Sequence, residues 1–104
     1  MRMRRIREYE IYLPSRRRDG GRIPSAELDE IKSELKELFG GYTTIGACEG
    51  TWKTNSKESR DDITILRILD DGSTSFDMTA FRERIEKSLQ QDRLLISARE
   101  IEIV

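Results

Sequence analysis

The sequence contains no histidine and only one cysteine, Cys48. Without histidine, the chain cannot build Ser–His or Cys–His nucleophile pairs, histidine metal clusters or the usual pH switch. A single cysteine forms no intrachain disulfide and no cysteine-rich zinc site, and it suits a reducing compartment. We therefore predict a cytoplasmic protein without cofactor or metal, in which any chemistry falls to carboxylates, tyrosines, arginines or Cys48.

Long apolar runs are also missing. No stretch approaches the ~18 residues of a membrane span. The basic residues 1–5 are not followed by the apolar segment of a secretory signal. The 104 residues carry 38% charged side chains and a net charge of −1. This composition predicts one folded domain over residues 1–104, with a heavily charged surface and no membrane partner.

Six segments alternate between strand and helix patterns. Apolar side chains predict strands over residues 6–13, 42–52, 63–69 and 94–104. Apolar side chains at helical spacing predict helices from Ser25 to about residue 39 and over about residues 78–89. Ser25 is the expected N-cap of the first helix, and Ser75 or Asp77 that of the second. The order predicts an α+β, ferredoxin-like β-α-β-β-α-β fold, a four-stranded antiparallel sheet with two helices on one face.

The predicted third strand is apolar on both faces, with Ile65 and Leu69 on one and Leu66 and Ile68 on the other. Helices on one side of a sheet cover only one of these faces. A second copy of the chain is the simplest cover for the other, so we predict a homodimer formed through the sheet. The alternative is that strand ends curl over loop residues and that a bulge changes the alternation.

Residues 1–22 hold eight arginines and only three acidic residues. Several arginines flank Gly20 and Gly21 just before the first helix, as in a site for a phosphate or nucleic acid. However, acidic residues such as Glu27 already occupy that helix terminus, and the third strand lacks the aromatic motif of RNA-recognition domains. The pattern therefore favours a solvated arginine loop over an anion site. The candidate anion-binding residues are Arg16, Arg17, Arg18 and Arg22.

The segment 46–52 places small residues beside the only tryptophan. Gly46, Cys48, Gly50 and Trp52 share one face of a strand and could floor a shallow pocket for a small molecule. The alternative, which we favour, is an edge strand in which the glycines create a bulge and Trp52 packs on its neighbour. The pocket candidates are Tyr42, Glu49, Trp52 and Arg67.

The acidic pair Asp61 and Asp62, with Glu58 nearby, could in principle hold a cation or act as acid and base. Adjacent residues on a strand point to opposite faces, so the two aspartates do not share one site. We predict solvated side chains and no metal here.

Three short motifs carry a resemblance over residues 25–70. They are Phe39-Gly40-Gly41-Tyr42-Thr43, then Gly46 with Gly50-Thr51-Trp52, and Asp62-Ile63 opening an apolar strand. This pattern resembles a group of small bacterial proteins without assigned function. The resemblance implies a ferredoxin-like fold and brings no catalytic residues with it.

Three functions remain open from the sequence. The first is a binding or regulatory module that dimerises through its sheet. The second is a small dimeric enzyme or ligand-binding protein with a pocket near Trp52. The third is a phosphate- or nucleic-acid-binding protein that uses the arginine-rich loop.

Overall fold

A computed structural model describes residues 3–104, apart from the side chains of residues 47 and 54. It confirms a small α+β protein with two helices and an antiparallel sheet. Within the described residues, none of the helices combines the length and the apolar character needed to cross a membrane. The elements are β1 (Arg4–Pro14), α1 (Ser25–Phe39), β2 (Thr43–Thr54), β3 (Lys57–Asp70), α2 (Met78–Ser88) and β4 (Ile96–Ile103).

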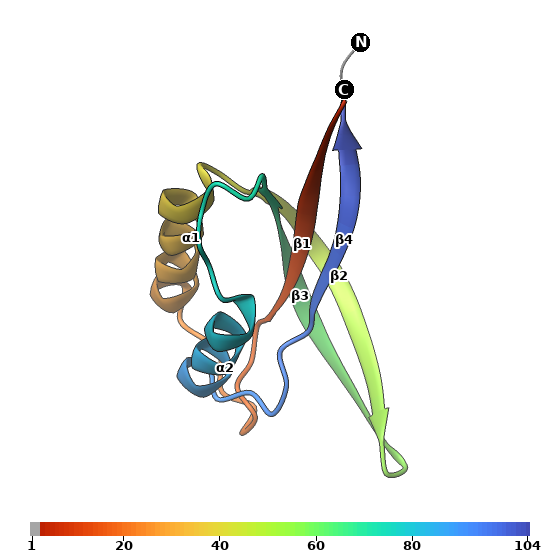
Figure 1. The fold of residues 1–104 in the computed structure, drawn as a ribbon. Coiled ribbons are helices and arrows are strands. Elements are labelled where there is room, and N and C mark those ends of the chain that lie inside the picture. The colour runs from red at the N-terminus through yellow and green to blue at the C-terminus, as the bar shows by residue number, and fades with distance from the viewer. Residues whose placement is uncertain (1–2) are drawn as a thin grey trace.

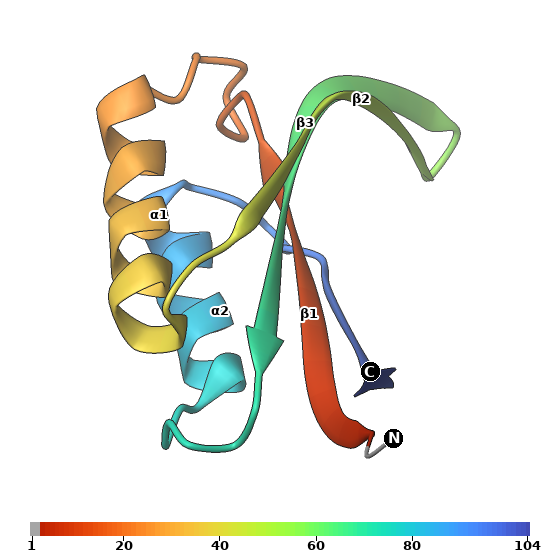
Figure 2. The same ribbon diagram turned by 90° about the horizontal axis from the view of Figure 1, so that it is seen from above.

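The strands lie in the order β2-β3-β1-β4, and both helices lie on one side of the sheet (Figures 1 and 2). The central strand β1 pairs antiparallel with both neighbours, so that Tyr9 faces Ile68 on β3 and Ala98 on β4. The other face of the sheet carries no helix. This one-sided arrangement determines which side chains are available to a ligand.

The hydrophobic core lies between the helices and one face of the sheet. Ile11 pairs with Leu66 at its centre, and both side chains are fully buried. The helices contribute residues from the apolar stripe on each, because residues three and four apart share a helix face. The buried helical residues are Ile31 and Leu35 on α1, and Phe81 and Ile85 on α2.

The two helices begin in different ways. Asp77 is the N-cap of α2, and its carboxylate accepts a hydrogen bond from the backbone N–H of Ala80 at 3.0 Å. The prediction that Ser25 caps α1 is wrong, because Pro24 occupies that position and no side chain caps the helix. At the other end, α1 stops at Gly40, whose φ of 82° lies in the left-handed region that favours glycine.

The predicted ferredoxin-like fold with a four-stranded sheet is wrong, because the sheet contains five antiparallel strand segments. The pairing of β2 with β3 shifts register between Ile45 and Cys48, which divides β2 and raises the number of antiparallel strand segments to five. A bulge of this kind inserts extra residues into one strand, interrupts the ladder and bends the strand. Gly46 lies at this bulge, and nothing lies within 4 Å of its Cβ position.

Beyond the bulge, residues 48–63 form a two-stranded hairpin arm that leaves the body of the molecule (Figure 1). Its turn contains Asn55 and Ser56, whose φ angles of 48° and 71° match a tight hairpin turn. The arm contributes to an elongated shape of 50 × 27 × 24 Å. The outer part of the arm is therefore paired only with itself.

Candidate functional site

The face of the sheet away from the helices, here called the open face, carries charged side chains at its centre. On β1, Glu8, Glu10 and Tyr12 alternate with the residues that point into the core. Cross-strand register places Arg67 of β3 opposite Glu10, and Arg99 of β4 opposite Glu8. Three strands therefore bring two carboxylates and two guanidinium groups together. These four side chains are the open-face cluster.

Hydrogen bonds join the cluster into two pairs, and a longer ionic contact links the pairs. Arg67 donates to Glu10 Oε2 from Nη2 at 2.8 Å and from Nε at 3.2 Å. Arg99 donates to Glu8 Oε1 from Nε at 2.9 Å, with Nη2 also 2.8 Å from the same oxygen. The Arg67 Nε also lies 3.7 Å from Glu8 Oε1. The cluster contains equal numbers of positive and negative groups, so its members neutralise one another.

Glu8 is the least accessible member, because its side chain is only 6% exposed although no helix covers it. Burying a carboxylate lowers the stability of the fold unless the carboxylate is paired with an opposite charge, and here the two arginines provide that charge. The side chain of Arg99 is 65% exposed and that of Arg67 is 36% exposed, so the arginines lie at the surface above Glu8. The hydrogen bond to Glu10 raises the pKa of Arg67, and the charge of Glu8 adds to this effect. Arg67 therefore remains cationic.

The cluster has less polar neighbours on both sides along the sheet. Tyr12 pairs with Ile65, and its hydroxyl donates to Glu10 Oε1 at 3.5 Å. On the other side, Glu8 pairs with Leu69, whose side chain is 45% exposed. An ordered set of charges beside apolar surface can bind a small molecule that has both hydrogen-bonding groups and an apolar part.

The residues predicted to form one pocket lie apart. Trp52 is on the hairpin arm, where it pairs with Ser59 of β3. Ser59 and Arg67 are eight residues apart along β3, which corresponds to about 26 Å at ~3.3 Å per residue. Glu49 pairs with Asp62, also on the arm, whereas Tyr42 directly precedes Thr43, the residue that pairs with Arg67. The structure thus separates Trp52 and Glu49 from Arg67. Of these candidates, only Arg67 belongs to the open-face cluster.

The arginine-rich loop is ordered by contacts within the molecule. Arg17 donates to Glu27 at 2.6 Å and to the carbonyl of residue 88 at 3.2 Å. Arg18 donates to Asp92 at 2.8 Å, and Arg16 to the carbonyl of residue 20 at 3.0 Å. Arg22 is exposed, and its backbone bridges to that of Arg16. These guanidinium groups point to separate partners and do not converge on one point.

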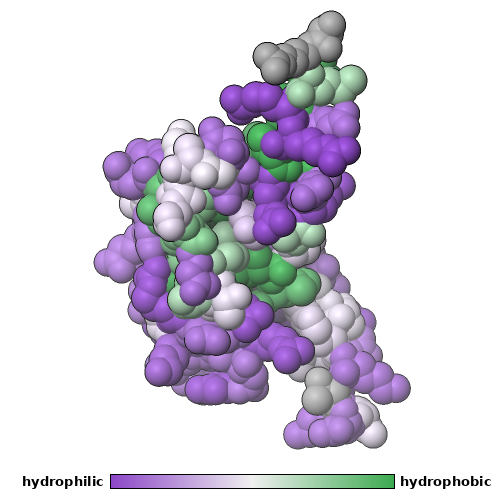
Figure 3. All heavy atoms as spheres, viewed as in Figure 1, coloured by the Kyte–Doolittle hydropathy of each residue, from purple (hydrophilic) through white to green (hydrophobic). Residues whose placement is uncertain are grey.

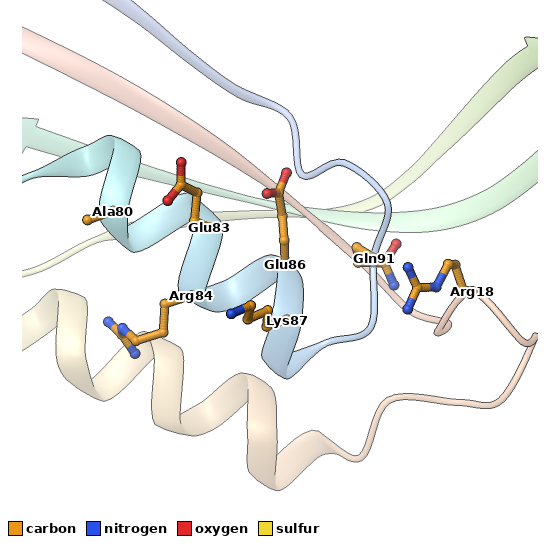
Figure 4. A pocket seen from close by; sticks show the side chains of 7 residues that line it. All are labelled: Arg18, Ala80, Glu83, Arg84, Glu86, Lys87 and Gln91. Atoms are coloured by element: carbon orange, nitrogen blue, oxygen red, sulfur yellow. The ribbon is translucent and has the colours of Figure 1, made fainter.

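A hollow of about 680 Å³ lies against α2 and includes Arg18 (Figure 4). Its charged groups are of both signs, and several already have partners. Arg84 pairs with Glu34 on α1, and Glu86 accepts a hydrogen bond from the backbone of Leu94 at 2.8 Å. We therefore place no functional site in this hollow. It is lined by Arg18, Ala80, Glu83, Arg84, Glu86, Lys87 and Gln91.

Glu8, Glu10 and Arg99 are site residues that the sequence analysis missed. The alternation of Glu8 and Glu10 with apolar residues indicated their shared face, but nothing in the sequence indicated their partners on other strands. Among the residues that the structure describes, no group of three or more histidine, cysteine, aspartate or glutamate side chains could hold a metal ion.

No family model matches the chain, and no curated protein matches it. Among solved structures, the fold is similar to that of a phage SAM lyase in complex with S-methyl-5′-thioadenosine. The TM-score is 0.67 and the identity is 9%, over 95% of this chain and 89% of that one. At this identity the similarity concerns the fold alone.

Proposed function

We propose that this protein is a small, enzyme-like ligand-binding protein, and that its open-face cluster binds an adenosine thioether or the related sulfonium compound SAM. The similar phage protein is a SAM lyase that was solved with S-methyl-5′-thioadenosine. The two proteins share a fold, which supports a ligand of the same chemical class. The residues that we propose to bind this ligand are identified from the structure of this chain and are not transferred from the phage protein.

The observation that carries the proposal is the buried carboxylate of Glu8 on an uncovered sheet face. Carboxylates held in place by arginines are suited to accept hydrogen bonds from the hydroxyl groups of a ribose. Glu10, whose side chain is 21% exposed, offers a second acceptor. Leu69 and Ile65 on either side of the cluster would contact the base and the methylthio group.

The homodimer belongs to the same proposal. Large apolar side chains remain exposed on the sheet strands and next to them, which is a common mark of an interaction surface. Two open faces packed against each other would cover them and exclude water from the cluster. The exposed residues are Leu69 at 45%, Leu95 at 51% and Ile103 at 36%.

Isothermal titration calorimetry with S-methyl-5′-thioadenosine and with SAM tests the proposal. We expect binding to the unmodified protein, and at least tenfold weaker binding to Glu10→Gln. Glu102→Gln is the matched control, because Glu102 is an exposed glutamate on β4 whose contact with Arg5 is 3.9 Å long. Equal affinity of the two variants, or no binding of either compound, would refute the assignment.

Two further measurements complete the test. Chromatography of SAM incubated with the protein would show whether S-methyl-5′-thioadenosine is released. Native mass spectrometry at low micromolar concentration would show the mass of a dimer, and Leu69→Gln should shift that mass toward the monomer. A monomer at every concentration would refute pairing through the open face.

A further inference from the structure

A second hollow lies at the end of the sheet where the described chain begins and ends, next to the last turn of α1. Its volume is about 410 Å³, within the range of ~300–1,000 Å³ common for small-molecule sites. Its lining comes from the sheet strands, from the C-terminal end of α1 and from the loop that follows β3. The lining residues are Arg4, Ile6, Leu38, Phe39, Gly40, Leu69, Asp71, Ser73, Thr74 and Ile103. We call it the terminal hollow.

Much of the lining of the terminal hollow is apolar. Ile6 of β1 is nearly buried, whereas Leu69 of β3 and Ile103 of β4 are 45% and 36% exposed. Figure 3 shows hydrophobic side chains at this end of the sheet, among hydrophilic ones. Aliphatic side chains left in water at a concave surface gain free energy when an apolar ligand covers them. An apolar part of a ligand is therefore expected here.

Two opposite charges line the same hollow. Asp71 accepts a hydrogen bond from the backbone N–H of Ser73 at 2.9 Å, which holds its carboxylate in place. The side-chain hydrogen bond with Ser73 lowers the pKa of Asp71, and the charge of Arg4 contributes to this effect. Arg4 is thus near Asp71, but no ion pair within 4.0 Å joins these two described residues. Each charge remains available to an additional partner.

We propose that the terminal hollow binds a free α-amino acid with an apolar side chain. Arg4 would bind the carboxylate of the ligand, Asp71 its ammonium group, and Leu69 and Ile103 its aliphatic or thioether side chain. A guanidinium group matches a carboxylate with two parallel hydrogen bonds. The hollow shares Leu69 and Ile103 with the dimer surface proposed above, so this assignment requires that both side chains stay accessible to the ligand.

Other ligand classes fit the charges less well. A phosphate or a fatty acid would match Arg4 but would bring a second negative charge close to Asp71. An amine would match Asp71 and bring a second positive charge close to Arg4. A zwitterion pairs with both groups at once, because its carboxylate faces Arg4 and its ammonium group faces Asp71.

Calorimetry with three related compounds tests the charge pairing. L-leucine carries both charges, 4-methylpentanoate lacks the ammonium group, and 3-methylbutylamine lacks the carboxylate. We expect L-leucine to bind at least tenfold more tightly than either analogue, with L-methionine similar to L-leucine. Equal binding of all three compounds, or binding of none, would overturn the proposal.

Variants locate the site. Arg4→Gln and Asp71→Asn should each weaken L-leucine binding at least tenfold, and Asn can still accept the Ser73 hydrogen bond. Arg5→Gln is the matched control, since the Arg5 side chain is 77% exposed and does not line the hollow. Circular dichroism would confirm that each variant is folded. If Arg4→Gln and Arg5→Gln bind L-leucine equally, the assignment is wrong.

Discussion

The indole ring of Trp52 lies over the backbone of Gly50, so closely that a Cβ atom at Gly50 would overlap both this ring and the side chain of Ile63. Trp52 thus packs within the hairpin arm and does not form the wall of a pocket. The outer part of the arm is paired only with itself, so this small apolar contact is part of what keeps its two strands in register.

Gly50→Ala should push the Trp52 ring away from Ile63. Because the overlapping atoms are the ends of flexible side chains, we expect a red shift of tryptophan fluorescence and a loss of stability near the lower end of the ~1–3 kcal/mol typical of overpacking. Gly46→Ala is the control, since nothing lies within 4 Å of its Cβ position. An unchanged emission maximum in Gly50→Ala would contradict the packing described here.

Glu8→Gln should destabilise the fold by about 1–3 kcal/mol, because it leaves two guanidinium groups without the buried counter-charge. Urea unfolding followed by circular dichroism measures this loss. The corresponding change at an exposed position, Glu102→Gln, should alter the free energy of unfolding by no more than about 0.5 kcal/mol. If both variants are equally stable, Glu8 contributes no more than a surface carboxylate does.

The helix caps offer a paired comparison. Asp77→Ala removes the hydrogen bond to Ala80 and should cost about 1 kcal/mol. Ser25→Ala should have almost no effect, because the side chain of Ser25 does not cap α1. Thermal unfolding of the two variants is sufficient, and the reverse order of melting temperatures would count against the assigned caps.

Ser73→Ala should raise the pKa of Asp71 toward its ordinary value of 3.8, because the largest cause of the lowered pKa is the side-chain hydrogen bond from Ser73. A carboxylate with a lowered folded-state pKa stabilises the protein fully at neutral pH, and this contribution is lost as the pH falls through the folded-state pKa. Carbon-13 NMR titration of the aspartate side chains measures the shift. Ser59→Ala, on the hairpin arm, should leave the Asp71 titration unchanged.

Sequence periodicity located the helices and most strand positions, because side chains that enter a core must repeat with the period of their element. Leu94 shows how a boundary escapes this reasoning. Its apolar side chain suggested the start of the last strand, but β4 begins at Ile96, and Leu94 enters the core from the preceding loop. The glycines of the segment 46–52 indicated a bulge, but the register shift between Ile45 and Cys48 is not specified by a pattern of side chains.

The candidate site was harder to predict than the fold. Arg67 was named as a pocket candidate, but its partners Glu8 and Glu10 were not. The pairing of Glu8 with Arg99 joins residues 91 positions apart in the sequence. Such a contact follows from strand register, and register could not be derived from one sequence. The arginine-rich loop showed the reverse problem, because a cluster of like charges in the sequence separated in space.

The central position of β1 has a consequence for folding. Its ladders with β3 and β4 join segments that are distant in the sequence, and contacts of this kind slow the search for the native state because large loops must close first. The hairpin of β2 and β3, which closes a short loop, can form early and offer β3 as a template for β1. Because β4 is the strand most distant from β1 in the sequence, we expect it to complete the sheet last. Until that step, Glu8 lacks its Arg99 partner, and the growing sheet exposes an unpaired edge to other chains.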